Sequence, residues 1–157
     1  MGDKPPSTDV ADILALGEPR PQCGAIAYRR APDLEVMLVT SRETGRWVIP
    51  KGGLMPGKTT WESAAVEAFE EAGVVGEIAR TPLGTYDYVK FLKSGEGAPC
   101  RVTVFALDVT EELLEWPEQD QRTTRWFSWS EAADTVHETG LKVLIHAFGA
   151  DAQRRLN

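Results

Sequence analysis

The chain has 157 residues, 42% of them apolar and 26% charged, which is ordinary for one globular domain with a buried core. Its formal net charge of −7 argues against a broad electrostatic surface for nucleic acid or anionic membranes, although a local basic pocket can still bind an anionic substrate. No stretch approaches 18 apolar residues, and the N-terminus lacks the apolar run of a signal peptide. We therefore expect a cytoplasmic protein with no membrane partner.

The first 18 residues carry two adjacent prolines and scattered charges, and they predict a flexible tail with one helical turn around residues 10–16. Residues 19–157 then form a single predicted domain. Its two cysteines, Cys23 and Cys100, have neither a CxxC nor a metal-ligand spacing, so we expect two free buried thiols.

Two apolar runs at residues 23–30 and 35–41 are separated by Ala31-Pro32-Asp33, which predicts a hairpin. A short strand follows at residues 47–49. Residues 51–58 contain three glycines and a proline and predict a loop with unusual backbone angles.

A helix is predicted next, because Thr59 and Glu62 have the spacing of a capping box and Gly73 fits a left-handed C-terminal cap. One stripe of this helix is apolar and small enough to pack closely on a sheet; it consists of Trp61, Ala65, Ala68 and Ala72. Glu62 is interpreted as a capping residue rather than a metal ligand.

Further strands are predicted at residues 74–79, 84–93, 100–109 and 125–129, and helices at 130–136 and 141–156. Together, these strands and helices predict a mixed sheet with helices on its faces, which is an α+β fold. Trp126, Trp129 and His146 are expected in the apolar core.

Three carboxylates on the first helix, Glu67, Glu70 and Glu71, share one face because of their i, i+3, i+4 spacing. They lie in the last turns, where the helix dipole disfavours anions, and no Lys or Arg occurs between Thr59 and Ala79. We infer that an external cation neutralises them. Oxygen ligands of this kind suit Mg²⁺ or Mn²⁺.

This segment resembles the Nudix box, in which a glycine and a loop precede Glu-x-x-Glu-Glu-x-Gly on a helix. Gly52, Glu67, Glu70, Glu71 and Gly73 match the pattern, whereas Lys58 stands where the family has Glu and Val66 where it has Arg. The resemblance implies an α/β/α sandwich with a mixed β-sheet and hydrolysis of a diphosphate bond.

The same resemblance implies a metal set made of Glu67, Glu70, Glu71 and Gly52, with Glu67 and Glu70 catalytic. For the general base, Glu70 is our first choice, Glu118 the second and Asp120 the third. Within the family, the chain looks closest to the diphosphoinositol polyphosphate phosphohydrolases; the segments that carry this likeness are residues 39–42, 46–53, 116–118 and 125–127.

Candidate phosphate-binding residues surround the box: Ser41, Arg42, Lys51 and Lys58. Arginine suits bidentate phosphate contact and lysine acts as a point charge. Lys58 has two interpretations, a phosphate contact or a solvated loop charge, and we favour the second. Arg29 and Arg46 are weaker candidates than Arg42. Five further cations could extend a basic cleft, although each is interpreted individually as a surface charge: Lys90, Lys93, Arg101, Arg122 and Arg125.

The sequence thus predicts a metal-dependent pyrophosphohydrolase acting on a small-molecule polyphosphate such as a diphosphoinositol polyphosphate or a dinucleoside polyphosphate. Two alternatives stay open: a pyrophosphohydrolase of RNA 5′ ends, and a non-catalytic ligand-binding module that lost residues at positions 58 and 66. We expect no extended nucleic-acid partner, and the oligomeric state, including a homodimer, is left open.

Overall fold

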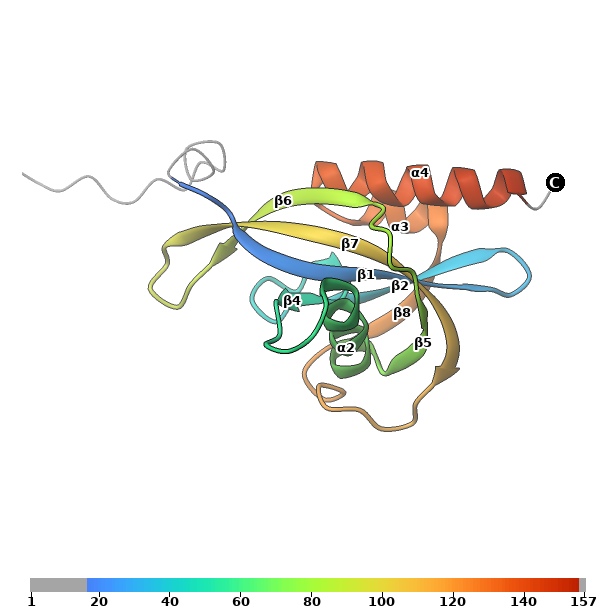
Figure 1. The fold of residues 1–157 in the computed structure, drawn as a ribbon, viewed down its shortest axis with the longest axis horizontal. Coiled ribbons are helices and arrows are strands. Elements are labelled where there is room, and N and C mark those ends of the chain that lie inside the picture. The colour runs from blue at the N-terminus through green and yellow to red at the C-terminus, as the bar shows by residue number, and fades with distance from the viewer. Residues whose placement is uncertain (1–16, 156–157) are drawn as a thin grey trace, which may run out of the picture.

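The computed structural model describes residues 17–155. Within them, one mixed sheet is covered on both faces, which is the predicted α/β/α sandwich (Figure 1). Helix α2 (Thr60–Ala72) lies on one face, and α3 (Trp129–Thr135) and α4 (Thr139–Arg155) lie on the other. The helical turn expected at residues 10–16 lies outside the described residues, as does most of the expected tail.

The strand order is β3-β2-β1-β7-β5, and three further strands pair alongside this path, β4 with β1, β6 with β7 and β8 with β2. Only β1 and β7 run parallel among the pairs of the described sheet. The strands are β1 (Arg20–Arg30), β2 (Leu34–Thr40), β3 (Trp47–Val48), β4 (Lys51–Gly53), β5 (Val74–Ile78), β6 (Gly84–Phe91), β7 (Gly97–Glu112) and β8 (Thr124–Ser128).

Two cores form because both faces of the central strands are buried. Successive side chains of β2 alternate between them: Val36 and Leu38 pack under α3 and α4, whereas Met37 and Val39 pack under α2. A strand covered on both faces reads as a continuous apolar run rather than an alternating one. This is why the apolar runs at residues 23–30 and 35–41 predicted strands correctly.

The ends of α2 are as predicted. Thr59 accepts a hydrogen bond from the Glu62 backbone, the Glu62 side chain accepts one from Thr59, and Gly73 adopts a left-handed conformation with φ of 67°. The apolar stripe differs by one position, since Ala64, Ala68 and Ala72 are buried and Ala65 is only half-buried.

Two other expectations need correction. The first residues of the predicted loop at 51–58 form β4, because their backbone groups pair with β1. His146 is exposed, with its ring packed edge-on against Trp129, rather than buried in the core. Cys23 and Cys100 are buried free thiols, as expected. None of the helices within residues 17–155 is long and apolar enough to cross a membrane.

Candidate active site

A cleft of about 380 Å³ opens beside α2. Its walls come from α2, β4, β6, the segment that follows β2 and the loop between β7 and β8. It brings together most of the predicted site residues: Ser41, Arg42, Lys51, Gly52, Glu67, Glu70, Glu71 and Glu118. Lys58 is exposed and is not among the residues that line the cleft.

Gly52 and Glu67 both line the cleft and are in direct contact with each other. Gly52 lies in β4, opposite Cys23 of β1, and the Glu67 carboxylate packs against its backbone. A Cβ atom at position 52 would overlap that carboxylate. The position therefore requires glycine for space, because any larger residue would displace the Glu67 side chain.

Arg122 supplies a cation that the sequence argument missed. Its Nη2 atom lies 3.4 Å from Glu71 Oε2 and 3.1 Å from Glu118 Oε1, and its side chain is only 9% exposed. Its Nη1 atom donates a hydrogen bond of 3.0 Å to the backbone oxygen of Thr40. The interpretation of Arg122 as a surface charge was wrong, and the acidic face of α2 is partly compensated from within the chain.

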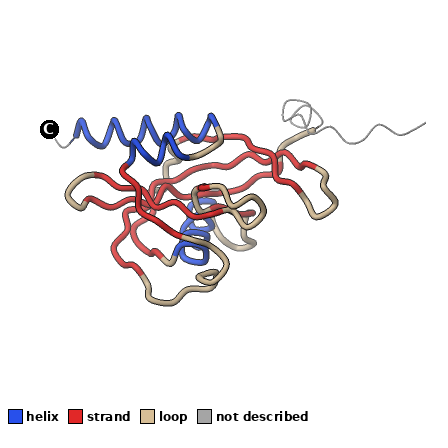
Figure 2. Tube along the Cα trace, turned by 180° about the vertical axis from the view of Figure 1, so that it is seen from behind, coloured by secondary structure: helices blue, strands red, loops and turns tan. Residues whose placement is uncertain are grey.

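The loop between β7 and β8 returns to the end of α2 (Figures 1 and 2), and this loop contains Arg122 and Glu118. The Glu118 backbone N–H donates to the Glu70 carbonyl at 2.9 Å. The Trp116 ring packs on Gly73 so closely that a Cβ atom there would overlap it. The C-terminal end of α2 thus holds the loop that completes the cleft.

Burial controls the charge of two carboxylates. Desolvation raises the pKa of Glu71 to about 8, since the neighbouring Glu67 and Glu118 add to the effect while Arg122 and Lys51 oppose it only in part. Desolvation likewise raises the pKa of Glu67, and the nearby Glu70 adds to this. With a pKa of about 8, Glu71 holds its proton at neutral pH unless a cation binds and displaces it.

Lys51 faces the same carboxylates from β4. Its backbone N–H donates to Glu71 Oε1 at 3.4 Å, and its Nζ atom lies 4.5 Å from the centre of the Tyr88 ring. Burial lowers the pKa of its ammonium group, and the charges of Glu71, Glu138 and Glu43 oppose that shift. The group is a concentrated positive charge inside the cleft, suited to a phosphate oxygen.

The donor atoms fit a hard divalent cation. Glu67, Glu70 and Glu71 offer carboxylate oxygens at one wall of the cleft, and such ligands suit Mg²⁺ and Mn²⁺. Within residues 17–155, no three His, Cys, Asp or Glu side chains are arranged to hold a metal ion unaided. Mg²⁺ is commonly held by one or two carboxylates together with substrate phosphates and water, so an open arrangement fits this ion.

The three candidate bases differ in their surroundings. Glu70 lines the cleft and forms no ion pair with any described residue. Glu118 also lines it, but its Oε1 atom is engaged by Arg122 and lies 3.5 Å from Arg42 Nη1. Asp120 is exposed and outside the lining. Glu70 is therefore the carboxylate best placed to accept a proton.

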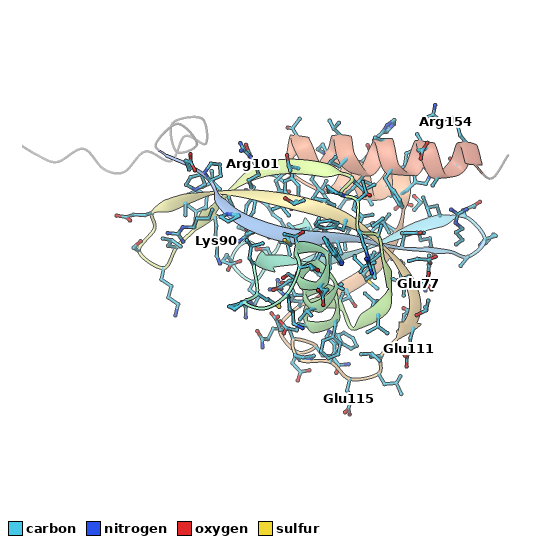
Figure 3. All side chains as sticks on the ribbon, viewed as in Figure 1. Glu77, Lys90, Arg101, Glu111, Glu115 and Arg154 are labelled. Carbon is cyan, nitrogen blue, oxygen red and sulfur yellow. The ribbon has the colours of Figure 1, made fainter. Side chains whose placement is uncertain are left out.

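Two cations that were weaker candidates from the sequence, Arg46 and Lys90, also line the cleft, and Figure 3 shows Lys90 projecting at the β6 end of the molecule. Glu43, Tyr88 and Glu138 line it as well and were not singled out from the sequence. By contrast, Arg29 is used structurally, since it pairs with Glu35 and Glu112 and stacks on Trp126.

Known proteins resemble this chain in sequence. A family model described as the NUDIX domain matches residues 19–148. Nudix hydrolase 13, mitochondrial, of Arabidopsis thaliana is 41% identical over 143 residues, which cover 80% of this chain and 71% of that protein. Diphosphoinositol polyphosphate phosphohydrolase 3-beta of Bos taurus is 33% identical over 114 residues, which cover 71% of this chain and 65% of that protein.

The fold is also shared with solved structures. The crystal structure of the C. elegans Ap4A hydrolase superposes with a TM-score of 0.62 and 20% identity, covering 86% of this chain and 99% of that one. This likeness concerns the fold, whereas the family model and the relatives concern the sequence. The family model and the sequence relatives show that this chain belongs to the Nudix hydrolase family, whose members hydrolyse phosphorus anhydrides, and the shared fold and the cleft are consistent with it.

Proposed function

We propose that the chain is a Mg²⁺- or Mn²⁺-dependent hydrolase that cleaves a diphosphate bond in a small-molecule polyphosphate. The observation that carries the proposal is the shared cleft, in which Glu67, Glu70 and Glu71 face Arg42 and Lys51. A purely acidic cleft would repel a polyphosphate and a purely basic one would not hold a metal ion. This cleft offers both charges within about 380 Å³.

In this proposal, the side chains that line the cleft have separate roles. Glu67 and Glu71 would hold the divalent cation, which would neutralise charge on the phosphate oxygens and acidify water. Glu70 accepts a proton from the attacking water. The water oxygen forms a bond to one phosphorus, the bond from that phosphorus to the bridging oxygen breaks, and the two phosphate-bearing products leave. Arg42 and Lys51 hold the non-reacting phosphates and orient the chain for this attack.

Dinucleoside polyphosphates and diphosphoinositol polyphosphates are the substrate types we propose. A bovine relative is named for the second type, and a nematode structure with the same fold is named an Ap4A hydrolase. Both substrate types present a diphosphate with further phosphates nearby, which suits a cleft lined by cations as well as by the α2 carboxylates. We also propose a cytoplasmic location, in which both thiols stay reduced.

Hydrolysis is favoured over simple ligand binding by the position of the two departures from the family pattern. Lys58 and Val66 are both absent from the cleft lining, whereas all three box carboxylates are part of it. The departures therefore leave the groups that would act on the substrate in place.

A phosphate-release screen tests the proposal. Purified protein would be assayed with Mg²⁺ and with Mn²⁺ on nucleotide sugars, dinucleoside polyphosphates, diphosphoinositol polyphosphates and capped RNA. We expect turnover of at least one small-molecule diphosphate and none of a phosphate monoester. Turnover confined to capped RNA would favour the RNA 5′-end alternative, and binding without turnover of any member would favour the ligand-binding module.

A further inference from the structure

Gln121 is an exposed residue of the loop between β7 and β8, and its side chain contacts Arg42. The Arg42 Nη1 atom donates a hydrogen bond of 2.7 Å to Gln121 Oε1. Arg42 lines the cleft, whereas Gln121 is not among the residues that line it. Any effect of Gln121 on a ligand in the cleft would therefore act through the Arg42 guanidinium group.

The contacts of Arg42 leave one edge of its guanidinium group free. Its Nη1 atom also lies 3.5 Å from Glu118 Oε1, so Gln121 and Glu118 engage the same nitrogen. Among the described residues, none forms a hydrogen bond or an ion pair with Arg42 Nε or Nη2. These two nitrogens form a planar fork that can bind two phosphate oxygens at once. An anchored Nη1 atom thus leaves a bidentate edge available to a phosphate.

The two segments that carry this pair are tied to each other. The Thr40 N–H donates to the Thr123 carbonyl at 3.0 Å, and the Thr123 N–H donates to Thr40 Oγ1 at 2.9 Å. The Arg122 side chain donates to the Thr40 carbonyl at 3.0 Å. These bonds lie within two residues of Arg42 on one segment and of Gln121 on the other. The backbone therefore brings the two side chains together independently of any ligand.

Of the two acceptors, Gln121 is the better anchor. Its bond to Nη1 is shorter than the Glu118 contact, and Glu118 Oε1 is also shared with Arg122 at 3.1 Å. The amide oxygen of Gln121 carries no net charge, so it holds the guanidinium group without repelling a phosphate as a carboxylate would. Arg42 is half exposed, and without an anchor its long side chain would have to be ordered when a ligand binds, which weakens binding.

We propose that Gln121 is a positioning residue that holds the Arg42 guanidinium group at the cleft, with its Nε–Nη2 edge available to a phosphate group of the substrate. The inference rests on the proposed function and adds to it a residue that acts without touching the substrate. Its consequence is specific: loss of the Gln121 acceptor should weaken phosphate binding only while Arg42 is present.

A double-mutant cycle on ligand binding tests this inference without requiring turnover. The probe is the bis-methylene analogue of tripolyphosphate, whose bridges cannot be hydrolysed, in the presence of Mg²⁺. Titration calorimetry would give its dissociation constant for the wild type, Gln121→Met, Arg42→Ala and the double variant. Methionine has a length similar to that of glutamine but offers only a weak acceptor.

The matched control is Gln119→Met, the same substitution in the same loop. Gln119 is exposed and outside the cleft lining, and its Nε2 atom donates to the Leu114 carbonyl at 2.9 Å. This variant also removes a hydrogen bond of the loop, but not one that reaches Arg42. It separates an effect on Arg42 from a general loosening of the loop.

We expect Gln121→Met to raise the Kd roughly three- to tenfold, the range for ordering one long side chain on binding. Arg42→Ala should raise it about tenfold or more, because a charged phosphate contact is lost. The double variant should match Arg42→Ala within about twofold, since the two residues act as a unit. Gln119→Met should stay within about twofold of the wild type, because additive effects are expected only for independent sites.

Four results would overturn the inference: an unchanged Kd in Gln121→Met, an equal increase in Gln119→Met, increases that multiply in the double variant, or a wild type that does not bind the analogue. Failure of the proposed function looks different. In that case the analogue would bind with the expected pattern across the variants, but no diphosphate would be hydrolysed in the presence of Mg²⁺ or Mn²⁺.

Discussion

The guanidinium group of Arg122 lies 3.4 Å from the Glu71 carboxylate, and both side chains are less than a tenth exposed. The two residues come from the loop before β8 and from the last turn of α2. Their contact joins the acidic face of the helix to the loop that carries Glu118. It also explains how the chain tolerates carboxylates near the negative end of the α2 dipole.

Replacement of Arg122 by Met should destabilise the fold. Removing Arg122 deprives two carboxylates, Glu71 and Glu118, of their buried cation, which costs about 3–5 kcal/mol. Removing Glu71 is different, because Arg122 then keeps its pair with Glu118. Chemical denaturation would measure the loss. The matched control is Arg101→Met, whose exposed pair with Asp87 at 2.8 Å is screened by solvent, so its loss should leave the free energy of unfolding almost unchanged (Figure 3). Equal losses for the two variants would contradict the buried role of Arg122.

Glu71→Gln should have a pH-dependent effect on stability. The pKa of Glu71 is about 8 in the folded protein, against an ordinary value of 4.5, so its contribution to stability is full below about pH 4.5 and is lost as the pH rises towards 8. Glutamine does not titrate. The variant should therefore gain stability over the wild type as pH rises, with Tm higher by about 2–4 °C or more at pH 8.5, the shift that ~1 kcal/mol produces in a domain of this size.

Thermal melts of metal-free protein at pH 5 and pH 8.5 would check the sign of the Tm difference between Glu71→Gln and the wild type. The exposed carboxylate variant Glu111→Gln serves as the control and should follow the wild type at both pH values. A Tm difference between Glu71→Gln and the wild type that is the same at pH 5 and pH 8.5 would show that Glu71 does not titrate in this range.

Arg42→Ala should raise KM more than it lowers kcat. Arg42 is half exposed at the cleft, where its Nη1 atom donates to Gln121 at 2.7 Å and lies 3.5 Å from Glu118 Oε1, so its guanidinium group is held at the cleft where a phosphate could bind. Charge-assisted contacts accumulate along a phosphate chain, so the KM increase should be about tenfold on a tetraphosphate and smaller on a diphosphate. Arg154→Ala, on exposed α4, is the control (Figure 3). Equal increases on both substrates would argue against a phosphate clamp.

Lys58→Ala should leave KM unchanged within error. The side chain is exposed, and the residue is outside the cleft lining although its backbone N–H bonds to Met55 at 3.1 Å. Steady-state kinetics on a dinucleoside polyphosphate would measure this. A KM increase of about tenfold or more would assign Lys58 to phosphate binding after all, since that change corresponds to a lost charged contact.

Local sequence signals were sufficient for α2 and its surroundings. Thr59, Glu62 and Gly73 define both ends of the helix through contacts within a few residues, and the spacing of Glu67, Glu70 and Glu71 fixes their shared side of the helix. Ser41, Arg42 and Lys51 follow or begin strands next to the box, so their presence at the cleft could be predicted as well.

Contacts between residues far apart in the sequence could not be predicted from such local signals. Arg122 lies in a loop with no periodic pattern, and it reaches Glu71 only because the loop turns back over the end of α2. Glu138 precedes a helix on the opposite face of the sheet and still lines the cleft, in a connection where Gly140 packs closely on Tyr86. The lack of any basic residue on α2 was a signal that a cation must come from elsewhere, but it did not say from where.

The most direct test of the account is hydrolysis by the box carboxylates with a divalent cation. Turnover of a dinucleoside polyphosphate would be measured for the wild type with EDTA, after Mg²⁺ or Mn²⁺ is restored, and for Glu70→Gln alone and combined with Glu71→Gln. We predict no turnover with EDTA, recovery with either metal, and a kcat lower by a factor on the order of 10²–10⁴ in Glu70→Gln. Glu111→Gln should match the wild type. Full activity in the double variant, or wild-type turnover that persists in EDTA, would contradict the assignment of this cleft as a metal-dependent active site.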